Sequence, residues 1–160
     1  MAALRILAIA AASGRVGYVY LTDRRLRDWG ISEKAAGGTV EAAALAQSWI
    51  NRLRPEVVAT EKLTADTRKG AHSQRLIAAI AETAAHNYLL DVEVRRLRTF
   101  PSKYEEAAAL AQRYPELAAW LPRKRRFFHS EPRSVVLFEA LALGEAVLDG
   151  PPTDLAAAMG

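Results

Sequence analysis

The stretch LRILAIAAASGRVGYVYLTDRRLRDWGI, at positions 4–31, decides the fold. Residues 4–10 form a continuous apolar run of strand length, and residues 16–22 are rich in β-branched and aromatic side chains. Residues 26–31 give a third run of the same kind after a polar turn. These patterns predict three β-strands. No crossover helix fits into connections this short, so the three strands must pair as an antiparallel meander.

The rest of the chain alternates between helix and strand patterns, with Thr39 and Ser102 as expected helix caps. The predicted elements are helices over residues 39–53, 72–87, 103–113 and 133–148, and strands over residues 57–60 and 91–97. A strand that follows a helix runs parallel to a neighbouring strand. The sequence therefore predicts an α/β fold with a five-stranded mixed sheet. Three antiparallel strands are followed by two parallel ones, and helices lie on both faces.

Composition bounds the class of protein. A chain of 160 residues fits one domain, which we place at residues 1–149, followed by a loose tail at residues 150–160. The chain has no cysteine, which excludes disulfides and thiolate metal sites. No stretch approaches the roughly 18 apolar residues that span a bilayer, so we expect a soluble, cytoplasmic protein without a membrane partner. The net charge of +4 is compatible with a nucleic-acid partner but is not diagnostic.

Two glutamates stand where carboxylates are uncommon. Glu61 directly ends the apolar run of residues 57–60. Glu139 lies in a helical stretch that is otherwise apolar from residue 135 to residue 143, where an unpaired buried carboxylate is costly. Both positions favour a role in a site. The alternatives are a surface glutamate at Glu61 and a salt bridge to an arginine at the core edge for Glu139.

Taken in order, the segments resemble the RuvC-type Holliday junction resolvases, which have an RNase H-like fold. Residues 7–13 with Gly17 resemble the opening of that family, residues 57–61 its fourth strand, and residues 138–143 its last helix. Lys103 resembles a lysine that the family carries at the start of a helix. The resemblance covers nearly the whole chain. It implies a metal-dependent, structure-selective endonuclease that acts on branched DNA, such as Holliday junctions, as a homodimer.

The resemblance also implies the chemistry of the site. Two Mg²⁺ or Mn²⁺ ions would act together, one activating water and the other stabilising the leaving oxygen. The implied catalytic residues are Glu61, Glu139 and Lys103, and the two glutamates are the implied metal ligands. Glu131, near the start of the last helix, is a further candidate ligand. Its alternative role is that of an acid favoured by the helix dipole.

Two positions depart from the family's pattern. The family's first strand ends in a metal-binding Asp, where this chain has Ala10. Its last helix carries a second acid three residues before the one matched to Glu139, and here that residue is Val136. Loss of the first Asp is expected to disable metal binding. Ala10 is either an engineered Asp→Ala substitution or a natural feature of a protein that binds without cutting, and the sequence leaves both open.

Basic residues are grouped around the predicted acids. The expected nucleic-acid contacts are Arg68, Lys69 and Arg75 after Glu61, and Lys103, Arg123, Lys124, Arg125 and Arg126 on the other side of the cleft. Such cations contact phosphates and add affinity without reading sequence. Any one of them is more often a solvated charge, but their grouping favours a nucleic-acid surface.

Other functions fit the same sequence. One is a non-catalytic DNA-binding module on the same fold. Another is a nuclease of the superfamily that processes RNA, for which we expect a glycine- and proline-bearing strand end where this chain has Ala-Thr-Glu-Lys at residues 59–62. A protein-interaction domain without a nucleic-acid role predicts no salt-dependent binding to any nucleic acid.

Overall fold

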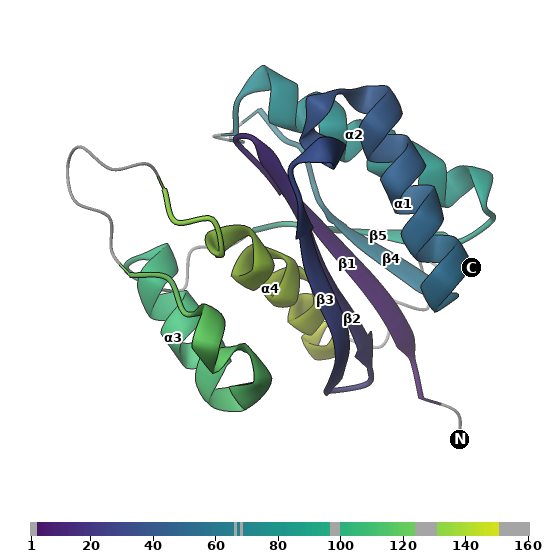
Figure 1. Cartoon of the computed structure of the whole chain (residues 1–160). Helices are drawn as coiled ribbons and strands as arrows, with labels where there is room; N and C mark the ends of the chain where they lie inside the picture. Colours follow the sequence, from purple (N-terminus) through teal and green to yellow (C-terminus); the bar gives the residue numbers. More distant parts are fainter. Residues whose placement is uncertain (1–2, 66, 68, 97–99, 124–130, 151–160) are drawn as a thin grey trace.

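A five-stranded sheet lies at the centre of the structure, a computed structural model that describes residues 3–65, 67, 69–96, 100–123 and 131–150 (Figure 1). Its strands are β1 (Arg5–Ala12), β2 (Arg15–Thr22), β3 (Arg25–Ser32), β4 (Val57–Glu61) and β5 (Leu90–Val94). They are ordered β3-β2-β1-β4-β5. The first three strands pair antiparallel, and β4 pairs parallel with both β1 and β5. The predicted mixed sheet is confirmed.

Helices cover both faces of this sheet (Figure 1). One face is covered by α1 (Thr39–Leu53) and α2 (Ala71–His86). The other is covered by α4 (Val135–Asp149), against which α3 (Lys103–Arg113) packs. Two short 3-10 helices, Lys34–Gly37 and Pro115–Trp120, precede α1 and follow α3. Among the described residues, no helix is both long and apolar enough to cross a membrane.

The strand β1 is buried on both faces, as its continuous apolar run predicts. Ile6 and Ala8 belong to the core under α4, whereas Leu7 and Ile9 belong to the core under α1 and α2. All four side chains are at most 1% exposed. This alternation assigns every second residue of β1 to the α4 face, and Ala10 is one of them.

Several boundaries differ from those predicted. The strand β1 continues to Ala12, because residues 11 and 12 still pair with β2, so Ala10 lies inside the strand and not at its end. Thr39 is the first residue of α1, and its cap is Gly38 without a side-chain hydrogen bond. Ser102 caps α3 as predicted, because its hydroxyl accepts a hydrogen bond from the backbone N–H of Glu105 at 3.2 Å.

The start of the last helix and the end of the last strand also differ from the prediction. The helix α4 begins at Val135, so Glu131 precedes it and does not stand in its first turn. The strand β5 ends at Val94, earlier than predicted. Residues 151–160 of the expected tail lie outside the described residues.

The helix α4 lies unusually close to the sheet at Gly17 of β2. A Cβ atom on Gly17 would lie 2.8 Å from Cγ1 of Val136 and 3.2 Å from its carbonyl carbon and oxygen. Gly17 is also the residue paired with Ala10 across the β1–β2 ladder. Glycine at this position therefore allows α4 to pack beside Ala10, and this packing sets the height of Glu139 above the sheet.

Substitution Gly17→Ala is expected to lower the free energy of unfolding by about 1–3 kcal/mol, because the new methyl group meets the backbone of a packed helix. Denaturant unfolding followed by circular dichroism measures the change. The matched control is Gly37→Ala, where the nearest atom to the added Cβ is Cγ of the flexible Glu41 side chain, at 3.8 Å. The control should change stability by less than about 0.5 kcal/mol. Equal losses in the two variants would contradict the role assigned to Gly17.

Candidate functional site

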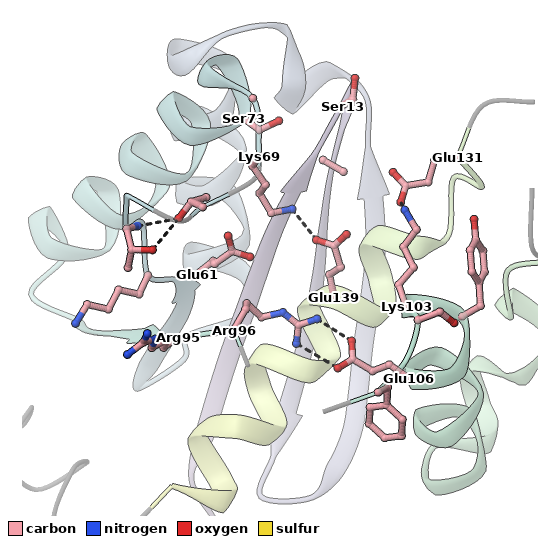
Figure 2. A pocket seen from close by; sticks show the side chains of 18 of the residues that line it. Ser13, Glu61, Lys69, Ser73, Arg95, Arg96, Lys103, Glu106, Glu131 and Glu139 are labelled. Carbon is pink, nitrogen blue, oxygen red and sulfur yellow. Dashed lines mark hydrogen bonds and ion pairs between the residues drawn. The ribbon is translucent and has the colours of Figure 1, made fainter. Parts of the chain in front are cut away.

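A pocket of about 1000 Å³ opens where the parallel strands β1 and β4 end. It is bounded by the β1–β2 turn, the segment that follows β4, the first turns of α2 and α3, and α4 (Figure 2). Most of its charged side chains come from the ends of these elements. The acidic and basic side chains that line the pocket are those of Glu61, Lys62, Lys69, Arg95, Arg96, Lys103, Glu106, Glu131 and Glu139.

The sheet and α4 bring Ala10, Glu61 and Glu139 together. Ala8 of β1 pairs with Ala59 of β4, so Ala10 and Glu61 each stand two residues further along neighbouring strands, on the face that α4 covers. Neighbouring strands lie about 4.8 Å apart. Glu139 extends from α4 over the same face, and Figure 2 shows its carboxylate and that of Glu61 directed into the same part of the pocket. The methyl group of Ala10 is 3% exposed and adds no polar atom there.

The ammonium group of Lys69 lies among these acids. Its Nζ donates a hydrogen bond to Oε2 of Glu139 at 2.7 Å and another to the backbone carbonyl of Ala11 at 2.6 Å. The Lys69 and Glu139 side chains are only 18% and 19% exposed. The sequence predicts Lys69 as a phosphate contact. The structure instead directs its charge inward, where it pairs with the partly buried carboxylate of Glu139.

Glu61 is partly buried and, among the described residues, forms no ion pair. Burial raises the pKa of its carboxyl above the usual value, and the nearby charge of Glu139 acts in the same direction. The positive charges of Lys69 and Arg96 oppose that rise in pKa. Lys69 and Arg96 therefore favour the ionised form of the Glu61 carboxyl, which burial and the charge of Glu139 disfavour.

Two further ion pairs hold the other wall of the pocket. Arg96 binds Glu106 through two hydrogen bonds, of 2.7 Å and 3.4 Å, which join the segment after β5 to α3. Lys103 pairs with Glu131. The candidate catalytic lysine and the further candidate metal ligand therefore neutralise each other and remain paired at the rim.

The described residues do not fit a magnesium centre. Mg²⁺ needs several oxygen ligands in near-octahedral geometry. Ala10 offers none, and Val136 is 1% exposed and packed onto Gly17. An ammonium group already lies against Glu139. Within the part of the chain that the structure describes, no three histidine, aspartate or glutamate side chains gather closely enough to hold an ion.

The expected phosphate contacts are spread more widely than predicted. Arg75 and Arg123 are exposed but do not line the pocket. Lys62 and Arg95 do line it, and among the described residues neither forms an ion pair. Sequence reasoning missed these two, although each directly follows a parallel strand, where ligand sites gather in α/β sheets. Arg68, Lys124, Arg125 and Arg126 lie outside the described residues.

Comparison with known proteins places this geometry in a fold family. No family model matches the chain, and no curated protein matches it in sequence. Among solved structures, RuvC of Thermus thermophilus in complex with a Holliday junction substrate is similar, with a TM-score of 0.58 and 16% identity over 92% of this chain and 96% of that one. The chain has the fold of the Holliday junction resolvases. The predicted RNase H-like architecture is thereby confirmed.

Two further structures support the same fold. Fowlpox virus resolvase in complex with Holliday junction DNA has a TM-score of 0.57 at 10% identity, over 91% of this chain and 99% of that one. The yeast mitochondrial Holliday junction resolvase Ydc2 has a TM-score of 0.51 at 10% identity, over 92% of this chain and 78% of that one. At such low identity, the likeness concerns the fold.

A partly buried acid lies next to the site, on the face of the sheet opposite to Glu61. Thr60 donates its hydroxyl hydrogen bond to Oδ1 of Asp91 at 2.9 Å. Burial raises the pKa of Asp91 to about 6, and the charge of Glu93 adds to the rise while the Thr60 hydrogen bond opposes it. An unfolded aspartate has a pKa of about 3.9. Between these two values the folded chain binds more protons than the unfolded chain, so its stability falls as pH rises through this window.

Substitution Asp91→Asn keeps an acceptor for Thr60 and removes the buried charge. We expect it to raise the free energy of unfolding by about 1–2 kcal/mol at neutral pH, a value reduced for the partial solvent exposure of the carboxyl. Near pH about 4 the two proteins should differ little. Urea unfolding across this pH range measures the difference. The control Glu116→Gln changes an exposed acid whose charge is not among those that act on Asp91, and a gain of equal size in both variants would contradict a special role for Asp91.

Proposed function

We propose that the chain binds branched DNA and, with the present sequence, does not cleave it. The main support is the fold, because two of the similar structures, RuvC and the fowlpox virus resolvase, are complexes with Holliday junctions. The pocket at the end of β1 and β4 is the part of this fold where the chain gathers its charged side chains.

The observation that carries DNA binding is the pairing pattern in this pocket. Three cations are neutralised by three acids, in the pairs Lys69–Glu139, Arg96–Glu106 and Lys103–Glu131. Lys62 and Arg95 remain available to contact phosphates. We also propose phosphate contacts for the exposed Arg75 and Arg123, and for Arg68 and the basic residues 124–126, which lie outside the described residues. Phosphate contacts of this kind supply most of the non-specific affinity for DNA.

The proposed lack of cleavage follows from Ala10, Glu61 and Glu139, the residues that the resemblance places at a metal centre. Hydrolysis of a phosphodiester needs an activated water and a cation on the leaving oxygen. Ala10 supplies no ligand for such a cation. The ammonium group of Lys69 is already bound to the Glu139 carboxylate and to the backbone carbonyl of Ala11. Glu61 and Glu139 alone therefore do not complete a nuclease centre.

The test is binding of a four-way DNA junction compared with a linear duplex of the same length and composition. We expect the junction to bind at least about 10-fold more tightly, with an affinity that falls linearly on a log–log plot against salt. We expect no nicked product with Mg²⁺ or Mn²⁺. Equal affinity for duplex and junction, or preference for structured RNA, would contradict the proposed substrate class. Binding to no nucleic acid at any salt concentration would leave a protein-interaction domain as the explanation.

Charge reversal tests the pocket itself. The variant Lys62→Glu/Arg95→Glu should weaken junction binding by about 10-fold or more and reduce the salt slope by roughly 2, because two phosphate contacts are lost. The matched control is Arg25→Glu/Lys34→Glu, which makes the same change of charge at exposed positions that do not line the pocket. If the control weakened binding as strongly, the affinity would depend on net charge and not on the pocket.

We also propose that the chain acts as a homodimer. A four-way junction has two-fold symmetry, so two copies of one chain can make equivalent contacts to it. Light scattering of the free protein and of its junction complex measures the assembly. A complex with a single chain per junction at saturating protein would contradict the dimer.

A further inference from the structure

The segment between β4 and α2 holds Lys69 in a fixed position. The backbone N–H of Thr64 donates to the hydroxyl of Thr67 at 2.8 Å, which closes a turn before Lys69. Gln74 of α2 then donates a side-chain hydrogen bond to the carbonyl of Lys69 at 2.7 Å. The backbone of Lys69 is therefore tied to the helix that follows, and its side chain extends back toward β1 (Figure 2).

The partners of the Lys69 ammonium are the kinds of atom that a hard cation prefers. One is a carboxylate oxygen of Glu139 and the other is the main-chain carbonyl of Ala11. Both lie beside Ala10, the position at which the resolvase-like pattern would place its first carboxylate. The ammonium group thus lies where oxygen ligands from β1 and α4 converge, and it brings the positive charge that a bound ion would bring.

The two glutamates require such a charge. Glu61 and Glu139 are both partly buried, and the charge of Glu139 adds to the rise of the Glu61 pKa. Lys69 is the cation that contacts Glu139 and that most strongly opposes the effect of burial on Glu61. A carboxylate at position 10 would add a third negative charge to the same space. With an uncharged residue at position 10, the single ammonium group of Lys69 therefore faces two carboxylates and not three.

We propose that Lys69 replaces a divalent cation in this chain, and that it excludes metal from the pocket even when a carboxylate is restored at position 10. The inference concerns the same pocket as the proposed DNA binding but does not depend on it. All of the measurements below are made without DNA, so either proposal can fail while the other stands.

Metal binding separates the effect of Lys69 from that of Ala10. The variants are Ala10→Asp, Lys69→Met and the double variant Ala10→Asp/Lys69→Met. The probe is Mn²⁺, and electron paramagnetic resonance measures the concentration of the free ion. We expect the double variant to bind Mn²⁺ at least about 10-fold more tightly than Ala10→Asp alone, because the competing ammonium is gone. If Ala10→Asp alone bound Mn²⁺ as tightly as the double variant, the proposal would be overturned. A folded double variant that bound no Mn²⁺ would overturn it as well.

Thermal stability tests the role of Lys69 as counter-ion. Lys69→Met should lower the melting temperature by about 5–10 °C, because Glu139 then loses its ammonium partner beside Glu61. The control Lys62→Met removes a lysine from the same pocket that is paired with no described carboxylate, and should shift the melting temperature by less than about 2 °C. An equal shift in both variants would overturn the proposal.

A second substitution keeps the test valid if Lys69→Met alone does not fold. Glu139→Gln removes one of the facing charges, so Lys69→Met/Glu139→Gln should fold and melt within about 5 °C of the unsubstituted protein. A general packing defect at Lys69 would not be repaired in this way. No recovery in the double variant would overturn the assignment of Lys69 as counter-ion.

Discussion

The close packing of α4 on the sheet is the constraint on which the rest of the structure depends. At one end, Gly17 lets the backbone of the helix approach β2. At the other end, Glu145 is 5% exposed and pairs with Arg113 of α3 and Arg24 of the β2–β3 turn, with a further hydrogen bond from Tyr114 at 3.3 Å. A buried carboxylate held by several partners adds directional contacts to the apolar packing of the helix. Glu139 lies between these two anchors, so its place above β1 is set by both.

Much of the fold follows from the sequence because its signals are local. The meander is encoded by three strand patterns with connections too short for a helix, and the parallel placement of β4 follows from the helix before it. The boundary errors have physical causes. Alanines 11 and 12 carry weak strand preference, yet they extend β1 because β2 continues alongside them. The predicted start of the last helix at residue 133 is two residues early, because α4 begins at Val135.

The site is less accessible to sequence reasoning. Glu61 and Glu139 can be found because a carboxylate interrupts an apolar pattern, which is a local signal. The direction of Lys69 cannot be found in this way, because it depends on a turn, on α2 and on a carboxylate 70 residues away. The pairing of Lys103 with Glu131 is equally non-local. A basic residue near predicted acids is therefore an ambiguous signal, since it serves equally as a phosphate contact or as an internal counter-ion.

This ambiguity bears on why a chain without the first carboxylate keeps the other two. If Glu61 and Glu139 served only a metal, they would be a liability beside Ala10, because buried carboxylates repel each other without a cation. Through Lys69, however, Glu139 joins α4 to the segment after β4, and the same ammonium reaches the carbonyl of Ala11 on β1. Three elements of the pocket are thus connected through one charge. Glu139 then has a structural purpose that does not require catalysis, and this is compatible with the proposed binding of DNA without cleavage.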